Sequence, residues 1–275
     1  MELTKEKMAE GLGRFIGRIQ ALPEVCTIQA RGTWIYKTDT VKEIRVKVAE
    51  IVEKSYHDRY SDVDLHVRAR LSPHDTVDAK DYMAMISRYG IDHTTCLGIA
   101  FSPENHTYRI VTKEGLRYDM GLEILPDEDA PLLKDAQDFY RRIPGEGWRA
   151  ADRFWFVQIQ ALGKLYRRDF LIGDHLANMN LNETLVLQMG MRDRQYGTTH
   201  HPYGHSEKLA YLPYLEDLRA HPGRCPYHND HPVFNYIADK LFAAGVVYDK
   251  LAERQIEGYE KRGEIFWEIW AAYAS

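Results

Sequence analysis

The stretch Tyr60-Ser61-Asp62-Val63-Asp64-Leu65-His66-Val67 alternates acidic or polar side chains with apolar ones. A period of two is typical of a half-buried β-strand, in which side chains two residues apart share a face. We therefore predict a strand from about Tyr60 to Arg70 that places Asp62 and Asp64 side by side. Two neighbouring carboxylates repel each other, and a divalent cation such as Mg²⁺ compensates that charge with oxygen ligands. The alternative is a polar strand face at a sheet edge.

The chain before this stretch predicts a helix and a short strand. Apolar residues recur at helical spacing over Thr4–Leu22, and Val25–Ala30 is a β-like run that stops at Arg31-Gly32-Thr33. Glycine lets backbone N–H groups approach a phosphate, and a hydroxyl donates a further hydrogen bond. Gly32-Thr33 is therefore either a phosphate loop or a simple turn.

The segment between that loop and the acidic stretch has two interpretations. Thr40-Val41-Lys42-Glu43 has the pattern of a capping box, which predicts a helix that continues to about Ser55. Ile44–Val48 also alternates, so a strand is the alternative.

After the acidic stretch we predict a helix over Lys80–Tyr89 and then a β-meander. Its strands are Leu97–Phe101, His106–Thr112 and Leu116–Leu125. Asp119 lies in the middle of the last strand, although aspartate is depleted in strand interiors. Asp119 is therefore a third candidate carboxylate unless it occupies an exposed edge, and Glu123 shares its face.

The pattern becomes helical beyond the loop at Pro144–Gly147, where we place a domain boundary. Long helices are expected over Phe154–Arg168, Asp169–Gln195, Val233–Arg254 and Gln255–Ala274, and one continuous helix is the alternative for the last two. The predicted class is α+β: residues 1–145 form a domain with a mixed sheet, and residues 146–275 form a helical bundle.

Two histidine-rich loops interrupt the second half. Cys225, His228 and His231 have a spacing that zinc ligands can adopt, and His200, His201 and His205 offer further nitrogens. The prolines nearby and the absence of a paired C-x-x-C favour ordinary surface histidines over a structural zinc site.

Composition and charge limit the class of protein. The 275 residues are 44% hydrophobic and 28% charged, with a net charge of -5 and a pI near 6.2. This balance argues against a protein that coats nucleic acid. The charged N-terminus, the three scattered cysteines and the lack of a long apolar run predict a cytoplasmic protein without disulfides or membrane spans.

Several of these motifs together resemble the DNA polymerase β-type nucleotidyltransferase superfamily, and within it the aminoglycoside 6-adenylyltransferase (streptomycin adenylyltransferase) group. The resemblance rests on Gly32-Thr33, on Ser61–Leu65 and on Arg117–Met120 in the first half. In the second half it rests on Phe154–Phe156, Lys164–Asp169 and Gly204–Pro213.

The resemblance implies Mg²⁺-dependent transfer of a nucleoside monophosphate, AMP from ATP, to a hydroxyl of a small cationic acceptor such as an aminoglycoside antibiotic, with release of pyrophosphate. It implies that Asp62 and Asp64 bind Mg²⁺ and that Asp119 is a metal ligand or the general base. Gly32 and Thr33 would hold the triphosphate, and the remaining phosphate contacts would come from Lys164 and Lys208.

Two features differ from the family pattern. The family has Gly-Ser where this chain has Gly-Thr, and about thirty residues separate this loop from Asp62. The geometry survives if Thr40–Ser55 is an inserted helix. Two other functions stay open: nucleotidyl transfer to a macromolecule, and a non-enzymatic helical interaction protein.

Overall fold

The computed structural model describes residues 3–71, 95–102, 107–129, 146–197 and 225–275. The chain divides into two compact units, Met1–Gly145 and Glu146–Ser275. The predicted helix over Lys80–Tyr89 lies outside the described residues.

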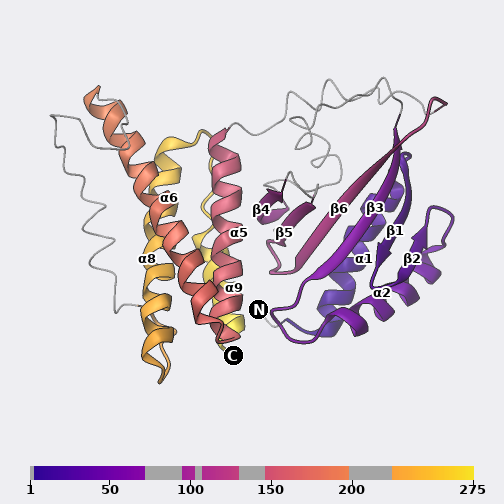
Figure 1. Cartoon of the computed structure of the whole chain (residues 1–275), viewed down its shortest axis with the longest axis horizontal. Coiled ribbons are helices and arrows are strands. Elements are labelled where there is room, and N and C mark those ends of the chain that lie inside the picture. Colours follow the sequence, from indigo (N-terminus) through magenta and orange to yellow (C-terminus); the bar gives the residue numbers. More distant parts are fainter. Residues whose placement is uncertain (1–2, 72–94, 103–106, 130–145, 198–224) are drawn as a thin grey trace. The chain divides into compact units, whose positions relative to one another are not determined.

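The first unit is built on one six-stranded mixed sheet (Figure 1). The strand order is β2-β1-β3-β6-β5-β4, and β3 and β6 are parallel, whereas the other pairs are antiparallel. The strands are β1 (Val25–Ala30), β2 (Thr33–Tyr36), β3 (Val63–Leu71), β4 (Cys96–Ser102), β5 (Thr107–Thr112) and β6 (Arg117–Pro126). The predicted α+β class with a mixed sheet is confirmed.

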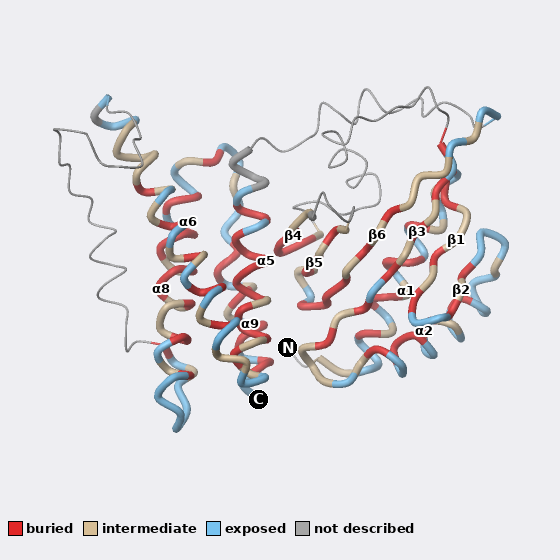
Figure 2. Tube along the Cα trace, in the orientation of Figure 1, coloured by how far each residue is buried: buried red, intermediate tan, exposed pale blue. Residues whose placement is uncertain are grey.

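Two helices, α1 (Lys5–Ala21) and α2 (Val41–Ser55), pack with the sheet around one continuous apolar core. Burial alternates along β3, so that Val63, Leu65 and Val67 are buried while Asp64 is exposed (Figure 2). The strand begins at Val63, and Asp62 is the residue just before it. The acidic side chains therefore lie on the sheet face opposite the core.

The segment whose structure the sequence left open is the helix α2. The Thr40 hydroxyl accepts a hydrogen bond from the Glu43 N–H (3.3 Å), and the Glu43 carboxylate accepts one from the Thr40 N–H (2.7 Å). This reciprocal capping satisfies two donors that a helix start otherwise leaves unpaired. The helical interpretation is correct, and the strand interpretation of Ile44–Val48 is wrong.

The described part of the second unit consists of helices, namely α5 (Glu146–Tyr166), α6 (Phe170–Tyr196), α8 (Pro232–Gln255) and α9 (Gly263–Ala274). Asp169 caps α6, and Arg168 before it has a left-handed backbone (φ 61°). The suggested continuity of the last two helices is wrong, because Ile256–Arg262 separates α8 from α9. Gly258 provides the required positive φ (68°) there. Among the described helices, none combines the length and the apolar character that a membrane crossing requires.

Candidate active site

The parallel register of β3 and β6 brings two of the predicted carboxylates together. Asp64 on β3 lies directly opposite Asp119 on β6, and neighbouring strands are about 4.8 Å apart. Asp62 comes two residues before Asp64 and therefore shares its face. We call Asp62, Asp64 and Asp119 the acidic triad.

Each member of the triad has an arginine partner. Arg31 lies 3.2 Å from Asp64, Arg109 lies 3.5 Å from Asp119, and Arg117 lies 3.4 Å from Asp62. Like charges that converge on one face attract cations, and the protein's own guanidinium groups partly neutralise the three carboxylates.

The turn before β3 is held by a network of hydrogen bonds that fixes the position of Asp62. The buried Ser61 hydroxyl accepts hydrogen bonds from the backbone N–H groups of His57 and Asp58, each at 3.1 Å. The buried Arg117 donates to the Tyr60 carbonyl at 2.9 Å. Ser61, the residue before the D-x-D pattern, thus stabilises the conformation of this turn.

The electrostatic environment of Asp119 differs from that of an ordinary surface aspartate. Burial raises the pKa of Asp119, and the Asp62 carboxylate raises it further. Arg109 and Arg117 oppose this shift and Asp64 adds to it, so that the pKa rises to about 6 from the usual 3.8. The side chain is 25% exposed. Asp119 can therefore exchange a proton near neutral pH.

The triad oxygens are not gathered into a tight cluster. Within the described ranges, one group of at least three Cys, His, Asp or Glu side chains has its ligand atoms all within 4.8 Å of one another. That group is Cys225, His228 and Asp239 in the helical unit. In the triad, each carboxylate is instead close to an arginine.

The donor set of the triad nevertheless fits Mg²⁺. Three carboxylates supply the oxygen ligands that this ion prefers. The pKa of Asp119 is raised first by burial and then by the Asp62 carboxylate, and Arg109 and Arg117 do not fully offset these two effects. Side-chain rotation of Asp64 and Asp119, which are opposite each other in the ladder, allows both to approach one ion.

The Gly32-Thr33 loop proves to be a β-hairpin turn between β1 and β2. Arg31 and Gly32 both have positive φ, 47° and 79°, as a two-residue type I′ turn requires. Arg31 reaches Asp64 from this turn, so Gly32 lies near the triad. Thr33 is buried with its hydroxyl inaccessible. Its neighbour Glu50 belongs to α2, so the Thr33 side chain is directed toward the helical face.

Glu123, a second carboxylate of β6 that could act as a base, lies on the triad's face but in a different environment. Its carboxylate accepts hydrogen bonds from His66 (2.8 Å) and Arg68 (2.7 Å). These two contacts, with His66 the larger effect, hold the pKa of Glu123 below its usual value. Glu123 is a weaker base than Asp119 for this reason.

The structure describes one of the two lysines that were predicted to contact phosphate. Lys164 belongs to α5 in the second unit and lies 3.3 Å from Asp169, the residue that caps α6. Lys208 lies outside the described residues.

Sequence reasoning did not identify Arg31 and Arg109 as part of the site. Arg31 precedes a glycine in what looked like a phosphate loop, and Arg109 alternates with apolar residues in a meander strand. A signal for Arg109 was present, because pairing the two last meander strands as a hairpin places it opposite Asp119.

Comparisons of the chain with protein-family models and with curated proteins found no match to either.

Proposed function

We propose that this protein transfers a nucleoside monophosphate, AMP from ATP, to a hydroxyl group of a small cationic molecule and releases pyrophosphate. The observation that carries this proposal is the position of Asp64 opposite Asp119, with Asp62 on the same face. The resemblance to aminoglycoside adenylyltransferases supplies the acceptor class.

The triad divides into two roles. Asp62 and Asp64 are the residues that would hold Mg²⁺, which supplies charge neutralisation of the triphosphate when it is bound. Asp119 accepts the proton of the attacking hydroxyl, because its pKa of about 6 suits a base near neutral pH. The acceptor oxygen forms a bond to the α-phosphorus as the bond to pyrophosphate breaks.

The hairpin turn supplies the phosphate contacts of the first unit. Gly32 offers a backbone N–H without a side chain in the way, and nothing lies within 4 Å of its missing Cβ position. Arg31 beside it offers a guanidinium group that can bind phosphate oxygens in a bidentate manner. Lys164 and Lys208 remain proposed phosphate ligands from the second half of the chain.

The test combines nucleotide binding with turnover. The wild type and the variants Asp62→Asn and Asp64→Asn are incubated with Mg²⁺, labelled ATP and a panel of aminoglycosides, and pyrophosphate release is measured. We expect release with at least one acceptor for the wild type and a loss of ~10²-fold or more in each variant.

A thermal shift with Mg²⁺-ATP provides the second readout. Saturation at about 100 times Kd should stabilise the wild type by ~2.7 kcal/mol, with a smaller shift in the Asp64→Asn variant. Asp127→Asn, a change just after the end of β6 and beside Arg70 (3.7 Å), is the matched control and should behave as the wild type. Equal stabilisation of all variants, with no pyrophosphate released, would overturn the proposal.

A further inference from the structure

The segment of residues 225–231, which precedes α8, packs against α8 and α9. Asn229 donates its backbone N–H to the Asn235 side chain (2.8 Å), and the Asn235 amide donates to the Asn229 carbonyl (2.7 Å). The ring of Tyr227 stacks on Trp270 of α9, with ring centroids 5.2 Å apart and planes 22° apart. The intervening backbone is therefore pre-organised by contacts that do not involve Cys225.

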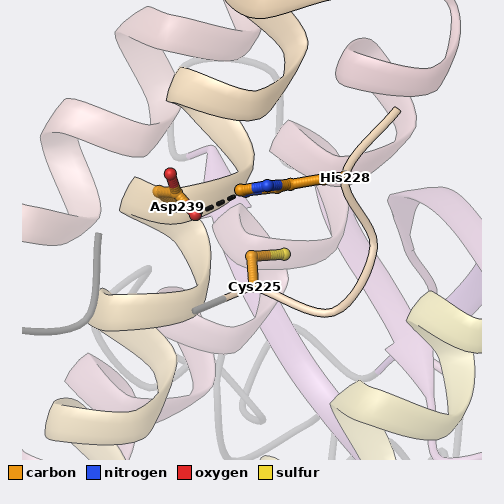
Figure 3. A group of neighbouring side chains, drawn as sticks. All are labelled: Cys225, His228 and Asp239. Carbon is orange, nitrogen blue, oxygen red and sulfur yellow. Dashed lines mark hydrogen bonds and ion pairs between the residues drawn. The ribbon is translucent and has the colours of Figure 1, made fainter. Parts of the chain in front are cut away.

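Three side chains of different chemistry converge where this segment meets α8 (Figure 3). Cys225, His228 and Asp239 each offer one ligand atom, and these atoms all lie within 4.8 Å of one another. Cys225 and His228 come from the segment before α8, and Asp239 comes from α8 itself. The cluster thus joins this segment to the helix.

The Cys225 sulfur is buried beside a backbone donor, and the cluster is open to solvent at His228. Cys225 is 5% exposed, and the backbone N–H of Tyr227 donates a hydrogen bond to its sulfur. Backbone donors of this kind orient and stabilise a ligating sulfur. His228 is 34% exposed on its side chain, so solvent reaches one side of the cluster.

We propose that Cys225, His228 and Asp239 bind a Zn²⁺ ion, with a water molecule in the fourth tetrahedral position. Sulfur, imidazole nitrogen and carboxylate oxygen are together the ligand types of zinc, whereas Mg²⁺ and Ca²⁺ take oxygen ligands. This site is separate from the acidic triad and independent of the proposed nucleotidyl transfer.

Zinc binding requires one small rearrangement. The His228 Nε2 and Asp239 Oδ1 atoms are 2.7 Å apart and share a hydrogen bond. Two ligands of one tetrahedral zinc ion at ~2.0 Å each are ~3.3 Å apart. The ion therefore replaces the shared proton, and a small side-chain rotation provides the additional separation.

His231, which the sequence pattern grouped with Cys225 and His228, is not part of this cluster. It is the N-cap of α8, and its ring lies 4.7 Å from that of Phe170. Asp239 is the third ligand instead, because it lies on the helix that the segment is attached to. His231→Ala is therefore a matched control in the same segment.

Cobalt substitution tests the site in the full chain. The protein is stripped with a chelator and titrated with Co²⁺, and the sulfur-to-cobalt charge-transfer absorption is recorded. We expect one Co²⁺ per chain with this absorption in the wild type, in Cys26→Ser and in His231→Ala, and its loss in Cys225→Ser. Competition with Zn²⁺ should show affinity that is at least ~100-fold weaker for His228→Ala and for Asp239→Asn, because loss of a partner behind a ligand alone costs ~10–100-fold.

Melting curves and the thiolate absorption distinguish metal binding at this site from unfolding of a variant and from binding at the acidic triad. Melting curves recorded in chelator identify any variant that loses metal because it is unfolded, and Zn²⁺ should raise the melting temperature of the wild type. Binding to the acidic triad gives no thiolate absorption. Absence of the absorption in the wild type, its persistence in Cys225→Ser, or unchanged zinc affinity in both His228→Ala and Asp239→Asn would each overturn the proposal.

Discussion

Asp119 combines a role in the proposed chemistry with a cost to the folded state. Its pKa rises from 3.8 in an ordinary setting to about 6 in the native protein. The native state therefore binds a proton more tightly than the unfolded chain does. Stability from this group is highest below about pH 4, declines as the pH rises to about 6, and stays lowered above that.

Asp119→Asn should accordingly stabilise the protein at alkaline pH. The substitution removes a charge that burial and Asp62 disfavour, so we expect a gain of ~1–3 kcal/mol in unfolding free energy at about pH 8 and little change at about pH 4. Denaturant unfolding at both pH values, without Mg²⁺, measures this. A variant that is less stable than the wild type at about pH 8 contradicts the assigned environment.

The same substitution should abolish the proposed proton transfer. We expect kcat/KM of the wild type to fall at acidic pH, because Asp119 must be ionised to accept a proton, and the midpoint should lie below the metal-free pKa of about 6 because bound Mg²⁺ favours the ionised carboxylate. Asp119→Asn should lose ~10²–10⁴-fold in rate and this pH dependence. Glu123→Gln, whose carboxylate contacts His66 and Arg68, should keep the same pH profile. If Glu123→Gln loses the profile instead, Glu123 is the base.

At the scale of single elements, α2 depends on its first turn. Thr40→Ala removes the hydroxyl that caps the Glu43 N–H, so it should lower the unfolding free energy by ~1 kcal/mol. Thr38→Ala, at an exposed position two residues earlier, is the control and should change little. Equal effects of both substitutions, measured by urea unfolding, would show that the cap contributes nothing.

The elements were largely predictable because their patterns are local. The alternation around Asp64 and the capping box at Thr40 each depend on residues a few positions apart, and both patterns match the structure. The break between α8 and α9 was missed because Ile256 and Tyr259 keep helical spacing across it, and the left-handed Gly258 marks it instead.

The site was predictable in part for the same reason. D-x-D spacing places Asp62 and Asp64 on one face, but the partner of each depends on pairing between distant strands. Arg31 and Asp64 are an example. Arg31 lies in the turn between β1 and β2, and it reaches Asp64 on β3, although α2 lies between them in the sequence. A hydroxyl such as that of Thr33 cannot be assigned to a face until the turn type is known.

At the scale of the whole molecule, the two compact units have different buried interactions. In the second unit Asp152 and Arg262 form an ion pair at 2.6 Å, with both side chains at most 3% exposed. Removing one partner of such a pair leaves an uncompensated buried charge, which costs ~3–5 kcal/mol.

Asp152→Ala should therefore lower one of two calorimetric unfolding transitions and leave the other unchanged. Thr40→Ala should shift the transition that Asp152→Ala leaves unchanged, because the two residues belong to different units. Differential scanning calorimetry of the full chain measures both. A single transition that moves with either substitution would show that the units unfold together.

The parallel ladder between β3 and β6 also determines which length changes the chain can accept. Asp64 and Asp119 meet through strand pairing, so added residues between Leu71 and Arg117 leave their register intact as long as the strands still pair. A single residue inserted inside β3 after Val63 turns every following side chain to the other face. Asp64 would then point into the core while Asp62 stayed in place. Homologous chains that keep this site should vary in length between the two strands and be free of insertions within them.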